Sequence, residues 1–173
     1  MQPREFAPHE ILLPVKPAFI AFTLIAALIV NLLPWSGWPL ALKPDFVALA
    51  LLYWCIQQPR KVGFTSAWLL GLMMDVADGS LFGQHALAYS VLAFAGLVLH
   101  RRVLMFTMRD QILHVIPLLL VNDLIVLAIR KIAGAEFPGF SYFAGSLIAG
   151  ALWPSVCFLF KLPQRPTPDP DDV

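Results

Sequence analysis

Residues 111–132 read QILHVIPLLLVNDLIVLAIRKI, a run in which His114 and the pair Asn122-Asp123 are the polar residues between the two ends. A helix needs about 20 mostly apolar residues to cross the hydrocarbon core of a bilayer. The whole chain of 173 residues is 59% hydrophobic and 13% charged, whereas soluble domains carry roughly 25% charged residues. The chain is therefore predicted to be an integral membrane protein, because lipid can solvate apolar surface that so short a chain cannot bury.

Five more apolar segments flank this run, and proline, glycine and charged residues separate them. The predicted fold is an all-α bundle of six transmembrane helices, which forms one membrane domain over residues 1–162. The six segments are 17–34, 45–58, 62–75, 83–100, 111–132 and 139–160. Residues 163–173 hold four prolines and three aspartates, a composition typical of a disordered tail.

The second and third segments are short. About 14 residues reach only about 21 Å as a helix, so these segments either extend into their flanks or form one re-entrant hairpin. The sequence leaves both arrangements open.

Basic residues indicate the orientation, because cytoplasmic loops carry an excess of Lys and Arg. With six spans, nine of the twelve Lys and Arg residues fall on the side of the two termini. The other side holds Lys43, Arg130 and Lys131. Both termini are therefore predicted to be cytoplasmic, in a multi-pass protein of a bacterial inner membrane. Arg101, Arg102 and Arg109 are expected to contact anionic membrane lipids.

Several polar residues gather on the predicted periplasmic side. Ionisable side chains inside a membrane usually face the bundle interior or water, and Asn122 and Asp123 are the clearest case. The others are Lys43, Asp45, Asp75, Asp78 and His85. One interpretation is a polar cleft that binds a partner or a small ligand. The other is that helix-end residues meet headgroups, with Asp123 paired to Arg130 or to an amide.

Known catalytic and metal-binding motifs are absent from the sequence. The four histidines lack the HExxH spacing, and there is no GxSxG, Walker lysine or dinucleotide fingerprint. The two cysteines lie in apolar runs and form no CxxC. A net charge of +1 argues against binding to nucleic acid. We expect neither an enzyme nor a resident metal or cofactor.

One region resembles a known family. It opens with Lys43-Pro44-Asp45-Phe46-Val47 and Tyr53-Trp54, continues with GFTSAWLLGLMMD at 63–75, and ends with GSLFGQHAL at 79–87. This order is similar to the central G…A…GLxxD…GxxxGxxAL pattern of the rod shape-determining protein MreD family. Length and the six expected spans fit the same family over nearly the whole chain.

The resemblance implies a non-catalytic part of the elongasome, the machinery that builds sidewall peptidoglycan in rod-shaped bacteria. Family members associate with the bitopic protein MreC and, through it, with MreB filaments, RodA and a class B penicillin-binding protein. The resemblance also implies a fold similar to the substrate-binding membrane components of energy-coupling-factor transporters. It makes the matched Asp75, Gly79 and Gly83 candidates for a structural or partner-facing link.

These observations give one leading hypothesis and two alternatives. In the first, the periplasmic face with Lys43, Asp75, Asp78 and His85 positions the membrane-proximal part of MreC. In the second, Asn122, Asp123 and Asp75 line the ligand pocket of a solute-binding transporter component. In the third, Asp75 and Asp123 are the acid and base of an intramembrane enzyme, although no nucleophile or metal set accompanies them.

Overall fold

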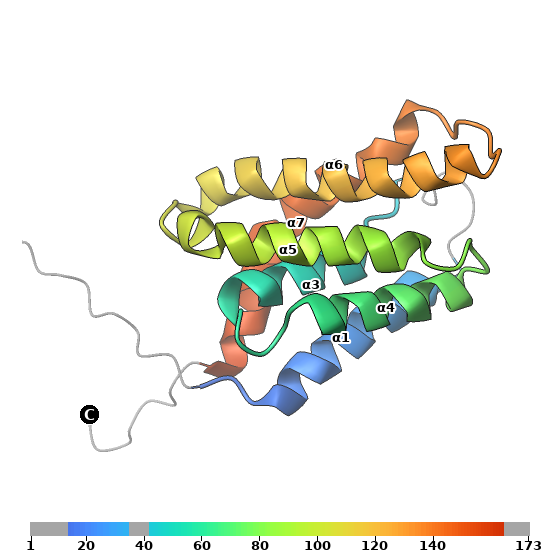
Figure 1. Cartoon of the computed structure of the whole chain (residues 1–173). Helices are drawn as coiled ribbons and strands as arrows, with labels where there is room; N and C mark the ends of the chain where they lie inside the picture. Colours follow the sequence, from blue (N-terminus) through green and yellow to red (C-terminus); the bar gives the residue numbers. More distant parts are fainter. Residues whose placement is uncertain (1–13, 35–41, 165–173) are drawn as a thin grey trace, which may run out of the picture.

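The computed structural model describes residues 14–34 and 42–164, and these residues form six α-helices and no strand (Figure 1). The helices are α1 (Pro17–Leu32), α3 (Phe46–Gln57), α4 (Phe64–Ala77), α5 (Gln84–Leu104), α6 (Met108–Ile132) and α7 (Ala144–Lys161). Two 3-10 turns, η1 (Phe140–Phe143) and η2 (Leu162–Gln164), flank α7. The all-helical prediction is confirmed. Most of the predicted tail lies outside the described residues, so the division into a membrane domain and a tail stays a prediction.

Helix α3 is the centre of the bundle. Its residues are apolar on every side, as expected for a helix surrounded by protein, and ten of its twelve residues are buried. It packs against α1, α5 and α7, whereas α4 lies mainly against α5. The two short segments are therefore separate members of the bundle rather than the two packed arms of one hairpin.

Aromatic rings and buried polar groups hold the core around α3. The indole of Trp54 stacks on Phe160 with ring centroids 5.5 Å apart, and its Nε1 donates a hydrogen bond of 2.8 Å to Thr23 Oγ1. The second buried indole, Trp153, donates to Gln111 Oε1 at 3.0 Å. Buried indoles are stable where the N–H finds a partner, and both do so across helices.

Helices α4 and α5 approach each other closely at Gly71. A Cβ atom at this position would collide with the backbone of Ala86, so only glycine allows this contact. Close backbone approach through small residues is a common way of packing helices in membranes. The contact fixes the end of α4 against the start of α5, which is where the candidate site lies.

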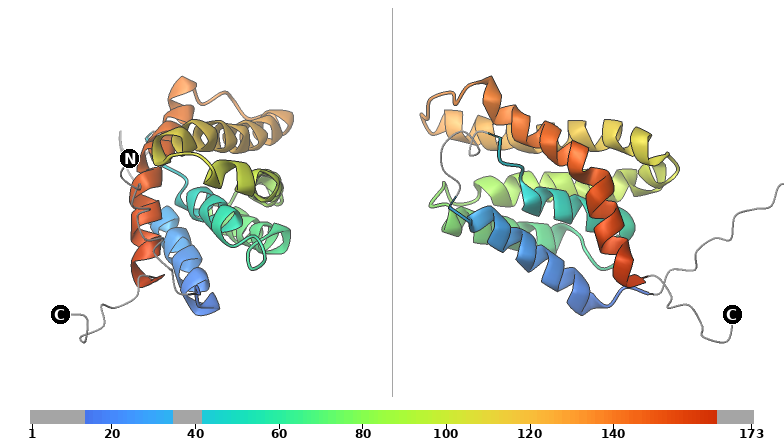
Figure 2. Two further views of the ribbon diagram at one scale, coloured as in Figure 1. Left: turned by 90° about the vertical axis from the view of Figure 1, so that its left-hand side faces the viewer. Right: turned by 180° about the vertical axis from the view of Figure 1, so that it is seen from behind.

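Three helical stretches are long and apolar enough to cross a membrane: Gln84–Leu104, Met108–Ile132 and Phe140–Gln164. The remaining helices, α1, α3 and α4, are apolar but shorter. Outward-facing side chains include Phe22, Val76 and Leu113, each about two-thirds exposed. Apolar outer faces of this kind suit contact with lipid. Pro117 and Pro154 lie inside α6 and α7, and Figure 2 shows α7 bending across the bundle.

The two ends of the bundle differ in charge. Successive helices run in alternating directions (Figures 1 and 2), so that the ends of α1, α4 and α6 meet the starts of α3, α5 and α7. Among the described residues this end holds three cations, Lys43, Arg130 and Lys131. The opposite end holds Lys16, Arg60, Lys61, Arg101, Arg102, Arg109 and Lys161. The end with few basic residues contains the polar groups described next.

Candidate functional site

Asp75, in the last turn of α4, is buried and accepts hydrogen bonds from the start of α5. Its side chain is 1% exposed. The backbone N–H groups of Gly83 and His85 each donate to it at 2.8 Å. The ring Nδ1 of His85 lies 2.8 Å from Oδ1, and Ser80 Oγ donates at 3.1 Å. We call Asp75 with Ser80, Gly83 and His85 the Asp75 cluster. The first N–H groups of a helix have no acceptor within the helix, and at the start of α5 the carboxylate of Asp75 provides one.

Two glycines make this arrangement possible. Gly79 and Gly83 have φ angles of +59° and +98°, a region that other residues adopt only with strain. Gly79 reverses the chain after α4, and Gly83 caps α5 in the left-handed conformation. The glycine and aspartate positions of the sequence motif are therefore parts of one folded turn.

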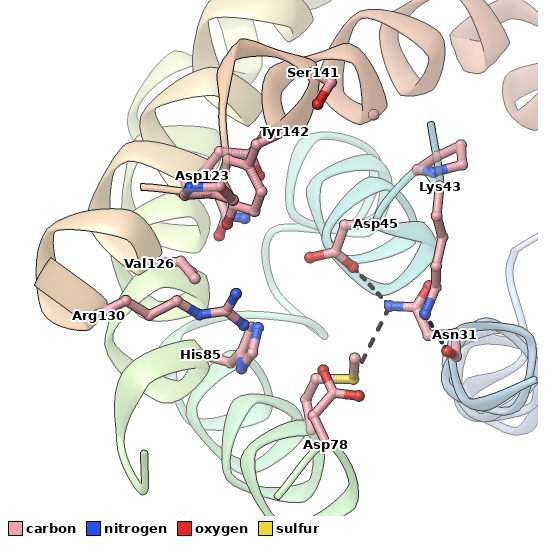
Figure 3. Close-up of a pocket in the computed structure, with 15 residues that line it drawn as sticks. Asn31, Lys43, Asp45, Asp78, His85, Asp123, Val126, Arg130, Ser141 and Tyr142 are labelled. Carbon is pink, nitrogen blue, oxygen red and sulfur yellow. Dashed lines mark hydrogen bonds between the residues drawn. The ribbon is translucent and has the colours of Figure 1, made fainter. Parts of the chain in front are cut away.

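Beside this turn lies a half-open cavity of about 330 Å³ (Figure 3). It is bounded by the ends of α1, α4 and α6, the starts of α3, α5 and α7, and η1. We call it the polar cavity. Its polar side chains are Asn31, Lys43, Asp45, Asp78, His85, Asn122, Asp123, Arg130, Ser141 and Tyr142.

One wall of the polar cavity is a closed hydrogen-bond network around Asp45. This residue is the N-cap of α3 and accepts from Ala48 N at 3.0 Å. It also accepts from Asn31 Nδ2 at 2.9 Å and from the Tyr89 hydroxyl at 2.8 Å. Lys43 donates from Nζ to the Asn31 carbonyl, which is one of the carbonyls that the end of α1 leaves unpaired. Asp45 and Lys43 are thus already engaged within the chain.

On the opposite wall, formed by α6, the hydrogen bonding of the side chains is less complete. Asn122 is 2% exposed, and its Oδ1 has no hydrogen-bond donor among the described residues. Its neighbour Asp123 accepts a hydrogen bond from Ser146 Oγ. Two turns further along α6, Arg130 donates from Nε to Gln84 Oε1 at 3.4 Å, and the amide nitrogen of Gln84 has no partner within the described ranges.

The structure brings together six of the residues singled out from the sequence: Lys43, Asp45, Asp78, His85, Asn122 and Asp123 all line the polar cavity. Asp75, Gly79 and Gly83 lie next to it and build its edge. Of the two pairings suggested for Asp123, that with Arg130 is wrong for the described residues, whereas that with an amide is confirmed, because the Asn122 side chain hydrogen-bonds to Asp123 beside the hydroxyl of Ser146. Arg130 contacts Gln84 instead because its side chain extends toward α5.

Sequence reasoning missed Asn31, Gln84 and Ser146. Asn31 interrupts the last turn of the first apolar run, and a buried amide in that position is a usable signal. Gln84 and Ser146 stand near helix starts, where polar residues are ordinary, so their sequence positions gave no reason to select them.

The arrangement offers binding groups. In the part of the chain that the structure describes, no three His, Cys, Asp or Glu side chains are grouped as metal ligands would be. The polar cavity instead combines carboxylates, amides and cations, the groups that fix the orientation of a bound molecule or peptide.

Comparison with known proteins identifies one family. The family model described as rod shape-determining protein MreD matches residues 15–162. A curated protein named rod shape-determining protein MreD, from Haemophilus influenzae, is 31% identical over 145 residues, which cover 82% of this chain and 87% of the relative. No solved structure matches, so the expected likeness to energy-coupling-factor transporter components stays a prediction.

Proposed function

The chain belongs to the MreD family of rod shape-determining proteins, and on that premise we propose that it is a non-catalytic scaffold or regulator of sidewall peptidoglycan synthesis that binds MreC. The family assignment itself implies a role in determining rod cell shape and an association with the membrane. We propose further that the chain crosses the bacterial inner membrane six times, with both termini in the cytoplasm. RodA, a class B penicillin-binding protein and, indirectly, MreB would join the complex through MreC.

The observation that carries this proposal is the α4–α5 turn, which is rigidly built and yet exposed. The Asp75 cluster fixes its backbone, while Phe82 at its tip is 74% exposed and Asp78 beside it is also exposed. An exposed aromatic side chain on a turn whose backbone is already fixed is suited to be a binding hot spot, because little backbone entropy is lost on binding.

The burial of Asp75 and His85 sharpens the hypothesis drawn from the sequence. Neither side chain is accessible enough to contact a partner, so their proposed role is to shape the turn. Direct contact with the membrane-proximal part of MreC falls to Asp78 and Phe82. The charge asymmetry between the two ends supports a periplasmic position for this turn.

The test is co-purification of MreC with tagged protein from native membranes in mild detergent. Loss of an aromatic hot spot costs about 2 kcal/mol or more, which corresponds to roughly 30-fold in affinity. We therefore expect Phe82→Ser and Asp78→Ser together to reduce recovery of MreC strongly. Met105→Ser, in the equally exposed turn between α5 and α6 at the opposite end, is the matched control and should retain MreC. Equal recovery of MreC with both variants, at equal membrane insertion, would refute the assignment of this turn.

A second candidate function is a solute-binding component of a transporter. The polar cavity with the unpartnered Oδ1 of Asn122 favours it. Recovery of a transport ATPase with a coupling subunit, and without MreC, in the same purification would support this alternative over the scaffold.

A further inference from the structure

The α6 wall of the polar cavity holds an acceptor and a donor that the chain itself leaves unused. We propose that this cavity binds a zwitterionic group, meaning a primary ammonium joined to a phosphate or carboxylate by a short linker. The ammonium would lie against Asn122 and Asp123, and the acidic group against Arg130. This ligand site goes beyond the proposed scaffold role and does not depend on it.

The ammonium side of the site is defined by Asn122. A carbonyl oxygen buried without a donor is destabilising, and such atoms are few in native proteins. Asn122 is buried and lines the cavity, and no donor among the described residues reaches its Oδ1. Asp123 adds a carboxylate at the same point of the wall. An ammonium group has three N–H donors and no acceptor, so one that pairs with the cavity-lining carboxylate of Asp123 has a further donor for the buried Oδ1 of Asn122 once that side chain turns toward it.

The acidic side of the site is defined by Arg130. Its guanidinium takes part in no ion pair within the described ranges, and Figure 3 shows it extending into the cavity beside His85. Its one hydrogen bond in these ranges uses Nε and leaves the two terminal nitrogens available. A planar guanidinium binds carboxylate or phosphate through two parallel hydrogen bonds.

The spacing fits one small ligand between the two groups. Asp123 and Arg130 are seven residues apart on α6, which places their Cα atoms about 10.5 Å apart along the axis. The long side chain of Arg130 extends into the cavity and shortens this gap (Figure 3). A single zwitterionic group can therefore touch both ends.

The charges around the cavity argue against a simple ion. Three carboxylates line it, those of Asp45, Asp78 and Asp123, and these would repel a bare anion. The two lining cations, Lys43 and Arg130, would repel a bare cation. Unpaired charges of both signs are costly in surroundings of low dielectric constant. A zwitterionic molecule can compensate both, because its positive group lies against a carboxylate and its negative group against a cation.

This chemistry has two sources, the headgroup of phosphatidylethanolamine and a free zwitterion such as an amino acid. The test uses the full-length protein purified in detergent, with native mass spectrometry and thermal unfolding as readouts. The probes are dihexanoyl phosphatidylethanolamine, its phosphatidylglycerol counterpart of equal chain length, and two soluble compounds, glycerophosphoethanolamine and glycine.

We expect phosphatidylethanolamine or a soluble zwitterion to be retained and to raise the melting temperature, and phosphatidylglycerol to do neither. Stabilisation by the soluble compounds would identify a free solute as the source, whereas a requirement for acyl chains would identify a lipid. In either case Arg130→Gln should bind about tenfold more weakly, because a charge-assisted hydrogen bond is lost. Lys131→Gln, an exposed neighbour outside the cavity, should bind as the wild type does.

Two results would overturn the proposal. One is equal retention of phosphatidylethanolamine and phosphatidylglycerol, with no response to the soluble zwitterions. The other is an Arg130→Gln protein that discriminates between the probes as well as Lys131→Gln does. Asn122→Leu gives a second variant on the ammonium side if Arg130→Gln fails to fold. MreC is absent from this assay, so its outcome is separate from that of the scaffold proposal.

Discussion

Two buried polar sites lie at the same end of this bundle, and they differ in how far the chain satisfies them. Asp75 receives backbone, hydroxyl and imidazole hydrogen bonds from residues 80–85. Asn122, on the other side of the polar cavity, keeps an acceptor for which no described residue provides a donor. Groups that the chain itself satisfies stabilise the fold, whereas unsatisfied ones in a native protein call for an explanation.

The comparison separates residues that stand out in the sequence motif from residues that are free to bind a ligand or a partner. Asp75 stands in the motif that carries the family resemblance, yet it is 1% exposed and has no free capacity to bind a partner. Asn122 belongs to no motif and faces the cavity. The motif therefore describes how the α4–α5 turn is built, and we assign binding to Phe82 and to the α6 wall.

The largest effect is expected from Asp75→Ala. Removing this carboxylate leaves the N–H groups of Gly83 and His85 without acceptors in a buried place, and each buried donor left unsatisfied costs about 1–3 kcal/mol. We expect a corresponding loss of unfolding free energy, measured by denaturation in mixed micelles. Asp78→Ala, three residues on and exposed, should change it by less than about 0.5 kcal/mol. If the two variants were equally stable, Asp75 would not be the centre of a satisfied cluster.

An intermediate effect is expected from Gly83→Ala. The φ angle of +98° costs a residue with a Cβ atom about 1–2 kcal/mol, although nothing lies within 4 Å of where that Cβ would be. The same denaturation experiment measures the loss. Gly63→Ala is the control, because Gly63 has no such backbone angle and a Cβ there would meet Leu97 at an ordinary 3.7 Å. A stable Gly83→Ala protein would mean that the turn relaxes and is not pre-organised.

The positions of the helices could be predicted from the sequence because hydropathy and helix breakers are local. The ends are less predictable. Helix α6 begins at Met108, three residues before the predicted start at Gln111, and its polar first turn carries a hydrogen bond of 2.8 Å from Thr107 Oγ1 to Asp110 Oδ2. A hydropathy profile cannot detect a helical turn that consists of polar residues. It also gave no sign that α3 is enclosed by other helices, because lipid and protein select the same apolar residues.

The candidate site could be predicted only as a region. Alternating spans place Lys43, Asp78 and Asn122 at one end once the spans are known. Which side chains pair depends on how the helices pack and rotate. The contact of Asn31 with Asp45 joins α1 to the start of α3, and that of Ser146 with Asp123 joins α7 to α6. Neither pairing has a signature in sequence spacing.

The smallest effect on stability is expected from Asn122→Leu, which tests the other half of the comparison. Leucine resembles asparagine in shape and removes the buried Oδ1 that lacks a donor, a gain that offsets the loss of the hydrogen bond from the Asn122 side chain to Asp123. We expect the unfolding free energy of the ligand-free protein to change by less than about 1 kcal/mol, against the much larger loss for Asp75→Ala. The stability of the variant and its response to a zwitterionic probe are informative only when they are considered together. A variant as stable as the wild type that no longer responds to a zwitterionic probe would show that Asn122 is kept for binding. A loss of stability as large as that of Asp75→Ala would instead mean that Asn122 is satisfied within the folded chain, and the two sites would then be of one kind.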